Sequence, residues 1–499
     1  MQRDIFPDRS QVAAELLRSQ PSSSVLIVPV DFAKREHVAQ ICSGTGEFLF
    51  QRPIIARNDA PGAAYLIERI EACCRRLGVP RSHVLVGGED APSYARNFLT
   101  ALAAAGLHLL RVQPADAKRY RTNTRATTDK LALNGIAQAI LCRRSYDLER
   151  LGGLYSTMKG AERTRRRLVW QETAAKNRIH RQVEWLFPGF LSQAQSGLLP
   201  FGSASLELMS EDFSVVHIRR LRTETLVRRL KQASVQHPAE AAEKLKALAG
   251  KTLAPPAEAI AYGSRSLALQ VGLLRGLQGA MKAEENEMAR CLAQTPGFLL
   301  TSIPGIGVVL AGGLVAEYGD PDHWPDPDRM ASYGGIVPRH YQTGGPDAQG
   351  ITGSLPLDCN HHLKDWLLQA AFHAGTTPHE AWDRMALPGD QHRLYEHYQR
   401  VELQEGHSRL STAKLLLRIG RAMVRDRRAY LPANALDPQA QDALSPEALV
   451  QYLGLTAAAV ARRWRGYDLS GLPEELNLLQ QWHKEIEALT QFHARGTTL

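Results

Sequence analysis

The sequence has few of the features that mark secreted, disulfide-stabilised or disordered proteins. Its six cysteines in 499 residues form no C-x-x-C pair and no regular framework, which argues against a disulfide scaffold or a structural zinc site. Residues 1–18 carry charges throughout and lack the apolar core of a signal peptide. There is no internal repeat and no low-complexity tail. We therefore expect a cytoplasmic, globular protein with buried or incidental thiols.

Long apolar runs are also missing, with one near exception. Residues 298–316 carry no charge and approach the length of a membrane-spanning helix. However, Pro304 and Gly305 interrupt this stretch and Glu317 ends it. This pattern predicts two short helices joined by a tight turn, and no association with a membrane.

The charge of the chain is unbalanced toward the basic side. The formal net charge is +9 and the sequence pI is about 9.3, which favours an anionic partner. Basic residues greatly outnumber acids between Lys118 and Arg181, where Arg165, Arg166 and Arg167 form a run. Such a cluster is typical of proteins that bind a phosphate backbone. A solvated helix face would give the same pattern, so charge alone leaves both interpretations open.

The first part of the chain alternates strand and helix signals. Strands are predicted at 25–30, 37–42, 48–55, 83–86 and 107–112, and helices at 63–77, 93–105 and 128–142. The order β-β-β-α-β-α-β-α matches the ribonuclease-H-like arrangement. We therefore predict an α/β N-terminal domain of this type.

The rest of the chain has helical signals. Residues 143–185 form a basic region with an intermittent apolar stripe, which favours a helical hairpin or coiled coil. Helical signals continue to residue 285, with interruptions at His237-Pro238, Pro255-Pro256 and Gly263, and a compact unit begins near Pro296. The chain is too long for one core. The expected parts are an α/β domain at 22–145, a basic helical linker at 146–290, a helical domain at 296–434 and a helical extension at 435–499.

Three acids occupy positions where a metal-dependent nuclease would hold its ligands. Asp31 and Glu89 each close an apolar run, and Asp129 opens a predicted helix. Each alone is better explained as a turn former or a helix cap. Together they form the oxygen-ligand set that two-metal phosphodiester chemistry with Mg²⁺ requires.

A second motif lies in the turn Ile303-Pro304-Gly305-Ile306-Gly307. It resembles a helix-hairpin-helix DNA-binding element, in which Gly305 and Gly307 would let backbone amides approach a phosphate. An ordinary helical hairpin is the alternative interpretation. The proline before the glycines favours the DNA-binding one.

Longer motifs around these residues resemble one family. Residues 31–37, DFAKREH, are similar to the D-x-A/S-K-x-x-H opening of the DEDD transposases of the IS one-ten insertion-sequence family. Glu89 with Tyr94 resembles the family's E-x-x-G-x-Y element, although Pro92 replaces the glycine. Thr128-Asp129-Lys130 with Ile136-Ala137 resembles its T-D-x-x-D-x-x-x-I-A helix.

The resemblance continues into the C-terminal half and covers roughly residues 24–430. Residues 302–307, 316–320 and 333–338 are similar to the family's second domain. Residues 176–178 and 187–190 agree with its linking region.

The resemblance implies a transposase or site-specific recombinase with a RuvC-like domain and a serine-bearing domain. Four acids would bind Mg²⁺, and a serine would form a covalent phosphoserine with DNA. A structured bridge RNA would select target and donor DNA, and homodimers would pair into tetramers with shared active sites. The protein would act in the bacterial cytoplasm, at the nucleoid. The candidate nucleic-acid contacts are Gly305, Gly307, Arg165, Arg166, Arg167 and Arg339.

The sequence departs from the family pattern at two chemically decisive positions. The fourth acid would stand one turn after Asp129, where this chain has Ala132. Asp147 lies too far along the chain to replace it. The nucleophile position holds Thr343, whose hydroxyl has the chemistry of serine with more steric crowding. Ser332 and Ser354 lack the expected flanking residues.

Three hypotheses follow. The first is a bridge-RNA-guided transposase or recombinase in which Asp31, Glu89 and Asp129 hold Mg²⁺ and Thr343 is the nucleophile. The second, supported by Ala132, is a nucleic-acid-binding descendant that is catalytically impaired. The third is a nuclease resembling the Holliday-junction resolvases. Retention of the whole second domain argues against the third.

Overall fold

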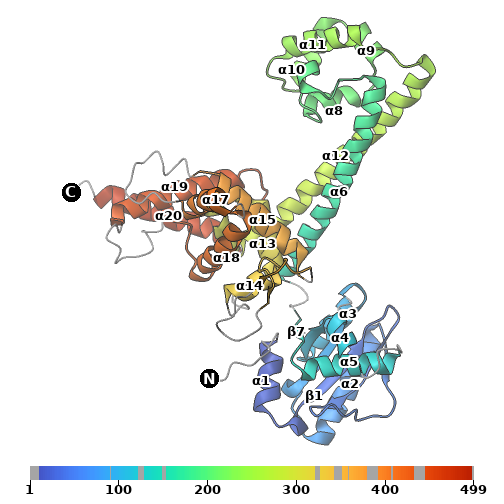
Figure 1. The fold of residues 1–499 in the computed structure, drawn as a ribbon, viewed down its shortest axis with the longest axis vertical. Helices are drawn as coiled ribbons and strands as arrows, with labels where there is room; N and C mark the ends of the chain where they lie inside the picture. The colour runs from blue at the N-terminus through green and yellow to red at the C-terminus, as the bar shows by residue number, and fades with distance from the viewer. Residues whose placement is uncertain are drawn as a thin grey trace. The chain divides into compact units, whose positions relative to one another are not determined.

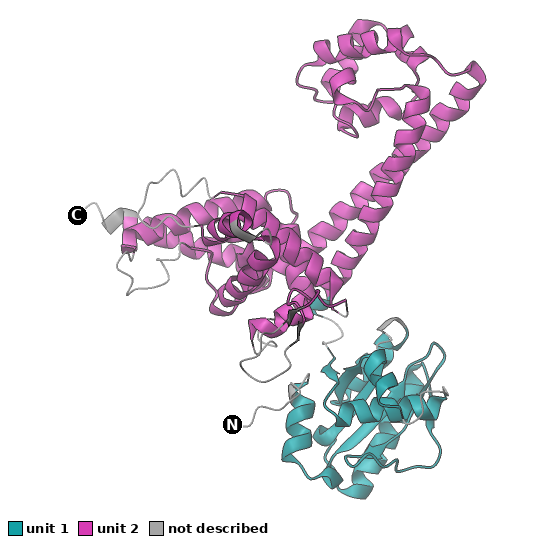
Figure 2. Ribbon diagram, in the orientation of Figure 1, with its two compact units in different colours: residues 1–156 teal, residues 157–499 magenta. Residues whose placement is uncertain are grey.

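The computed structural model describes residues 10–89, 92–121, 128–148, 153–320, 326–341, 351–357, 359–378, 392–405, 408–431 and 444–496. The chain forms two compact units, residues 1–156 and residues 157–499, which Figure 2 shows in different colours.

Unit 1 is built on a mixed β-sheet with the strand order β4-β2-β1-β5-β6-β7 and a short β3 that also pairs with β1. The strands are β1 (Leu26–Asp31), β2 (Glu36–Ala39), β3 (Cys42–Ser43), β4 (Ile54–Arg57), β5 (Val84–Glu89), β6 (His108–Val112) and β7 (Tyr146–Asp147). β1 pairs antiparallel with β2 and parallel with β5. Both β1 and β5 are buried along their length except at the last residue. They are therefore the central strands of the unit, which explains their nearly continuous apolar sequences.

Helices cover both faces of this sheet. They are α1 (Gln11–Ser19), α2 (Ala60–Leu77), α3 (Pro92–Ala104), α4 (Pro114–Arg119) and α5 (Asp129–Leu141), with 3-10 turns η1 (Ser22–Ser24) and η2 (Arg81–His83). Leu26, Val28 and Val30 belong to the hydrophobic core that includes residues of α2 and α3. Ile27 belongs to the opposite core, with residues of α1, α4 and α5. This alternation follows from the two-residue period of a strand.

The predicted α/β section followed by helices is confirmed, and its strand order is consistent with a ribonuclease-H-like fold. The third predicted strand lies later than expected, at 54–57 in place of 48–55. Pro53 stands just before it and has no N–H to give to a ladder. The short elements α1, α4 and β7 were not predicted.

Two long helices dominate the first part of unit 2. α6 (Leu154–Leu186) and α12 (Ala257–Ala293) run antiparallel beside each other (Figure 1). Gln182 Nε2 of α6 donates to the carbonyl of Gly263 of α12 at 2.8 Å, and Arg165 Nε is 2.7 Å from Glu285 Oε1. Buried apolar residues of both helices share one core: Ala175, Ile179, Val183, Leu186, Leu267, Val271 and Leu274. These polar contacts and this shared core hold the two helices together.

A helical subdomain separates α6 from α12 in the sequence. It contains α7 (Gln193–Ser196), α8 (Ser203–Met209), α9 (Val215–Arg220), α10 (Thr223–Gln232) and α11 (Pro238–Lys251). Phe187, Phe190 and Phe213 pack together at its centre, with ring centroids 4.7–6.0 Å apart. Their cluster joins the core of the long hairpin to that of the subdomain.

The remaining elements of unit 2 are mostly helices, and one of them is strongly apolar. They are η3 (Pro296–Ser302), α13 (Val308–Tyr318), α14 (Pro327–Tyr333), β8 (His340–Tyr341), β9 (Ile351–Thr352), α15 (His361–Thr376), α17 (Arg393–Glu405), α18 (Ser408–Asp426), α19 (Pro446–Trp464), η6 (Glu474–Leu476) and α20 (Leu478–Gly496). α13 is the apolar helix, and it contacts α12, α15 and η3. In the described part of the chain, no helix is long and apolar enough to cross a membrane.

The end of α19 holds the turn that precedes α13. Arg463 donates hydrogen bonds to the carbonyl oxygens of Thr301 and Ile303, the second at 2.9 Å. The Nε1 atom of Trp464 donates to Thr301 Oγ1 at 3.0 Å, in a buried position. Residues more than 150 positions later in the sequence therefore complete the environment of this turn.

Candidate active site

Two of the three predicted acids lie at the same edge of the sheet in unit 1. Asp31 is the last residue of β1 and Glu89 is the last residue of β5. These strands are parallel neighbours with Val30 opposite Gly88, so their carboxyl ends meet. Both acids are half-buried. The carboxyl ends of adjacent parallel strands are a common place for ligand-binding groups in α/β folds.

The third acid comes from a helix that packs on the same strands. Asp129 is the first residue of α5, and the hydroxyl of Thr128 caps this helix by accepting from the Leu131 N–H at 3.4 Å. α5 packs against β1 and β5. Asp129 is exposed. The helix cap thus fixes the start of α5, where the exposed Asp129 lies.

The electrostatics of these acids show that their charges interact. Burial raises the pKa of Asp31, and the charge of Asp129 raises it further, against the opposing charges of Arg121 and His37. Burial also raises the pKa of Glu89, and Asp31 adds to this effect while Arg121 opposes it. A site in which carboxylates resist ionisation favours a bound cation.

Arg121 supplies positive charge at this site. Its Nη2 atom lies 3.4 Å from Glu89 Oε1. Gly135 of α5 makes room for it, because a Cβ at Gly135 would lie 2.3 Å from the carbonyl oxygen of Ala117 and 2.9 Å from Arg121 Cγ. The sequence showed Arg121 only as part of a basic cluster. Its place beside Glu89 depends on the packing of α4 against α5, which residue spacing does not reveal.

The position of the missing fourth acid is defined by α5. Ala132 lies one turn after Asp129 and is buried. Asp147 lies elsewhere, on β7, where its Oδ1 atom accepts a hydrogen bond of 2.5 Å from Ser10 Oγ. β5 and β6 separate β7 from β1 in the sheet. Asp147 therefore does not replace the fourth acid.

The three acids do not lie as close together as the members of one cluster in unit 2. In the described residues, potential ligand atoms of Glu162, Glu317 and His362 in unit 2 lie within 4.8 Å of one another, whereas Asp31, Glu89 and Asp129 do not form such a group. The cluster in unit 2 already contains cations: Arg163, Arg166 and Lys159 lie within ion-pair distance of its carboxylates. Because these cations balance the buried carboxylates, we interpret that cluster as an ion-pair network.

The predicted nucleophile, Thr343, lies outside the described residues. The strands β8 and β9 flank its segment and pair antiparallel. The pairing extends to Arg339, whose N–H donates to the Ser354 carbonyl at 3.2 Å and whose carbonyl accepts from Gly353 at 2.7 Å. The side chain of Arg339 is exposed.

The three consecutive arginines of α6 have different environments. Arg165 forms an ion pair with Glu285, and Arg166 forms ion pairs with Glu162 and Asp365 at 3.3 and 2.8 Å. Arg167 is exposed, and its Nη2 atom donates to Thr164 Oγ1 at 3.2 Å. Arg165 and Arg166 are therefore engaged in contacts within unit 2, while Arg167 faces solvent.

The glycine turn before α13 has a packing role. Gly305 has φ +78°, and a Cβ there would lie 2.3 Å from the carbonyl oxygen of His373 in α15. Gly307 is the N-cap of α13, with φ −90° and open space around the position of a Cβ. The first arm of the turn, η3, is a seven-residue 3-10 helix. Backbone geometry and close packing thus explain Gly305, whereas neither explains Gly307.

Two models of transposase families match the chain. A model for DEDD transposases of the IS110 type, described as "Transposase", matches residues 28–188. A second model, described as "Transposase IS116/IS110/IS902 family", matches residues 298–384. A comparison with curated proteins gave no match. The first match contains the three acids and the second contains the glycine turn and Thr343. The chain therefore belongs to the IS110 family of insertion-sequence transposases, enzymes that act on DNA.

Proposed function

We propose that this protein is a transposase or site-specific recombinase of a mobile element, which cuts and rejoins DNA with Mg²⁺ and a hydroxyl nucleophile. The observation that carries the proposal is that Asp31 and Glu89 lie at the ends of adjacent parallel strands. The negative charge of Asp129 acts on this pair and raises the pKa of Asp31. This pair lies within the segment matched by a DEDD transposase model.

The residues of the acidic group suit a magnesium ion. Carboxylate oxygens are the ligands that Mg²⁺ prefers. The pKa values of Asp31 and Glu89 are raised by burial and by neighbouring carboxylates, and a bound cation would offset both effects. We assign Asp31, Glu89 and Asp129 as the ligands. Bound there, Mg²⁺ would stabilise charge on the oxygens of the scissile phosphate. Arg121 would neutralise part of the remaining negative charge at Glu89.

Thr343 is our candidate for the nucleophile. Attack by its Oγ1 atom forms a Thr–phosphate bond while the bond from phosphorus to the leaving deoxyribose oxygen breaks. The hydroxyl proton passes to solvent or a nearby base. Support comes from its flanks Gln342 and Gly344, which resemble the Q-S-G motif that contains the serine in the family.

For nucleic-acid contacts we favour the exposed members of the candidate set. Arg167 and Arg339 are exposed and suited to phosphate contact, and Gly307 leaves the N-terminus of α13 open to one. Arg165, Arg166 and Gly305 would instead maintain the structure that presents these groups. From the family resemblance we also propose a bridge RNA as guide, and homodimers or homotetramers as the active form.

A covalent-trapping experiment tests the proposal. Full-length protein is incubated with Mg²⁺ and supercoiled DNA that carries the element ends, and protein–DNA adducts are separated by denaturing electrophoresis. We expect an adduct with the wild type and with Thr343→Ser, and none with Thr343→Ala. An adduct that persists in Thr343→Ala would exclude Thr343 as the nucleophile.

The buried Ala132 favours one alternative, a catalytically impaired nucleic-acid-binding protein. Tight DNA binding by the wild type without any adduct would support this alternative and contradict the recombinase. Cutting of branched DNA that is unaffected by Thr343→Ala would instead support a resolvase-like nuclease.

A further inference from the structure

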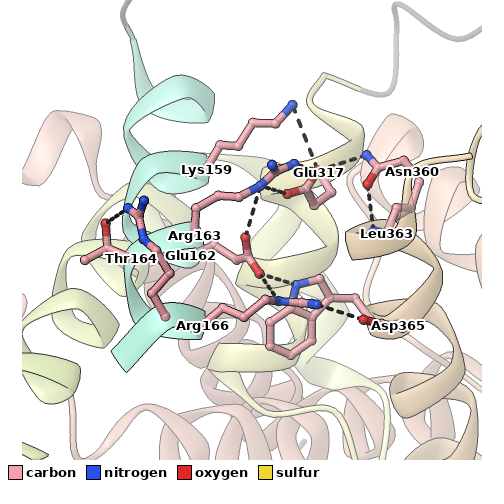
Figure 3. Close-up of polar contacts among 11 residues, drawn as sticks. Lys159, Glu162, Arg163, Thr164, Arg166, Glu317, Asn360, Leu363 and Asp365 are labelled. Atoms are coloured by element: carbon pink, nitrogen blue, oxygen red, sulfur yellow. Dashed lines mark hydrogen bonds and ion pairs between the residues drawn. The ribbon is translucent and has the colours of Figure 1, made fainter. Parts of the chain in front are cut away.

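A buried carboxylate at the end of α13 contacts residues of α6 and the N-cap residue of α15 (Figure 3). The side chain of Glu317 is completely buried. Arg163 of α6 donates to it with two nitrogens, Nε to Oε1 at 2.8 Å and Nη2 to Oε2 at 3.0 Å. Asn360 Nδ2 donates to Oε2 at 2.9 Å. Glu317 is therefore held by groups from two separate segments.

Asn360 carries this contact to the end of α14. Its Oδ1 atom caps α15 by accepting from the Leu363 N–H at 3.1 Å. Its own backbone N–H donates to the carbonyl of Tyr333, the last residue of α14, at 2.8 Å. One residue thus connects Glu317, the start of α15 and the end of α14.

These contacts close the base of the β8–β9 hairpin. Tyr333 lies before the hairpin and Asn360 after it, and their backbones are bonded to each other. Gly335 and Cys359 meet one step further in, where a Cβ at Gly335 would lie 2.4 Å from Cys359 Sγ. The pairing of Arg339 with residues 353 and 354 follows, and then the strands themselves. A change that moves Tyr333 or Asn360 should therefore also move the base of this hairpin.

The second buried carboxylate of the cluster lacks such a connection. Glu162 is also completely buried, and its Oε1 atom accepts from Trp366 Nε1 at 2.8 Å and Arg166 Nε at 3.3 Å. Its Oε2 atom accepts no hydrogen bond and lies 3.7 Å from Arg163 Nε, which is ion-pair distance only. A glutamine at position 162 can keep both bonds to Oε1. A glutamine at position 317 loses a donor whichever way it is turned, because both oxygens of Glu317 accept.

We propose that Glu317, held by Arg163, is a positioning residue that fixes the base of the β8–β9 hairpin through Asn360, and that the rate of attack by the proposed nucleophile depends on this order. The proposal rests on the proposed function for the role of Thr343. The ordering of the hairpin base does not depend on it. A buried ion pair contributes little net stability compared with apolar side chains of the same size, so an orienting role suits this one.

Two conservative variants of the full-length protein separate this role from general stability. Glu317→Gln and Glu162→Gln make the same chemical change in the same buried cluster. Adduct formation is timed at saturating DNA with Mg²⁺, and DNA affinity and the unfolding temperature are measured beside it. We expect Glu317→Gln to slow adduct formation by on the order of 100-fold with DNA affinity unchanged, because small misplacements of a reacting group have effects of this size. Glu162→Gln should stay within about threefold of the wild type.

Hydrogen–deuterium exchange provides a readout that is independent of activity. Peptides covering residues 339–357 should exchange at least about tenfold faster in Glu317→Gln, since a hydrogen bond to a charged group is lost. Asn360→Ser keeps an N-cap oxygen and the Arg163–Glu317 pair, and should show the same faster exchange. It also provides the test if Glu317→Gln does not fold.

The outcomes are distinguishable. Unchanged exchange in Glu317→Gln and Asn360→Ser, or equal effects of Glu317→Gln and Glu162→Gln, would overturn the positioning role. Faster exchange in a protein whose wild type forms no adduct would contradict the proposed function and leave the ordering of the hairpin base supported.

Discussion

At the scale of single residues, the positions of Asp31 and Glu89 lower the stability of the folded state when both are ionised. Burial and mutual repulsion raise the pKa values of Asp31 and Glu89 above those of the unfolded chain. The folded state therefore binds protons more readily than the unfolded state. Its stability rises as pH falls from above the raised pKa values to the ordinary ones near 4. Above the raised pKa values both groups are ionised, and this is where a bound cation has the largest effect.

This leads to a prediction for Asp31→Asn. Removing one charge should raise the metal-free unfolding temperature of unit 1 at pH 7.5, by roughly 2–4 °C. The increase that Mg²⁺ gives the wild type should disappear. Differential scanning calorimetry at pH 7.5 and pH 5, with and without Mg²⁺, measures both effects. An equal Mg²⁺ response in Asp31→Asn and wild type would exclude Asp31 as a ligand.

Ala132→Asp tests the missing acid directly. Without metal, a carboxylate in this buried position should lower stability by about 1–3 kcal/mol. With Mg²⁺, the variant should bind the ion more tightly and form the covalent DNA adduct faster. Ala132→Asn has the same size without the charge, and should share the loss of stability without the gain. If both variants respond identically to Mg²⁺, the fourth ligand does not belong at this position.

The places of the three acids in the fold were predictable from sequence, because each falls in a short motif at the end of a strand or the start of a helix. Their surroundings were not. Arg121 reaches Glu89 only because Gly135 leaves space between α4 and α5. The sequence likewise did not show that Arg165 and Arg166 contact Glu285 and Asp365, which lie more than 100 residues away along the chain.

At the scale of elements, strong periodicity predicted most of the α/β section, and local chemistry explains the misses. β7 has two residues and α4 has six, too few to produce a periodic signal. Gly263 was interpreted as an interruption but lies inside α12. Trp185 and Leu186 of α6 pack on it, and a Cβ there would lie 2.8 Å from each. Close helix–helix packing explains this glycine, and no local rule reveals it.

The glycine turn before α13 offers a matched pair of variants. Gly305→Ala should destabilise unit 2 by about 1–2 kcal/mol or more, because it adds left-handed strain and a clash with α15. Gly307→Ala should change stability by less than about 0.5 kcal/mol. Urea denaturation and DNA affinity at two salt concentrations measure these effects. Weaker DNA binding in Gly307→Ala at unchanged stability would support a phosphate contact at the start of α13, and unchanged binding would argue against one.

At the scale of the whole molecule, the hydrophobic cores follow the two units. The clusters built on the sheet contain residues of unit 1 alone, and the cluster of the long hairpin contains residues of unit 2 alone. The seven tryptophans all follow residue 156. Tryptophan fluorescence therefore reports the unfolding of unit 2, while circular dichroism reports both units.

We predict two unfolding transitions that respond to different changes. Mg²⁺ should raise the temperature of the transition that appears in circular dichroism but not in fluorescence. Glu317→Gln should lower the temperature of the transition that appears in fluorescence. The pKa of Glu317 is lowered because hydrogen bonds from Arg163 and Asn360 and the charge of Lys159 together outweigh its burial. Its contribution to stability is therefore present at neutral pH and lost as pH falls below about 4.5. A single transition that coincides for both probes would contradict independent units.

The clamp on the glycine turn by α19 also has a consequence for the order of synthesis. All residues of the sheet in unit 1 precede residue 148, so this unit has its whole core as soon as it leaves the ribosome. Residues 301–303 emerge long before Arg463 and Trp464, which hold them. At about 5–20 residues per second, the delay is on the order of ten seconds or more. During translation, the acidic site can therefore fold well before the turn that precedes α13 reaches its final environment. A nascent chain on a ribosome that stalls in that interval would have a folded acidic site and an incomplete glycine turn.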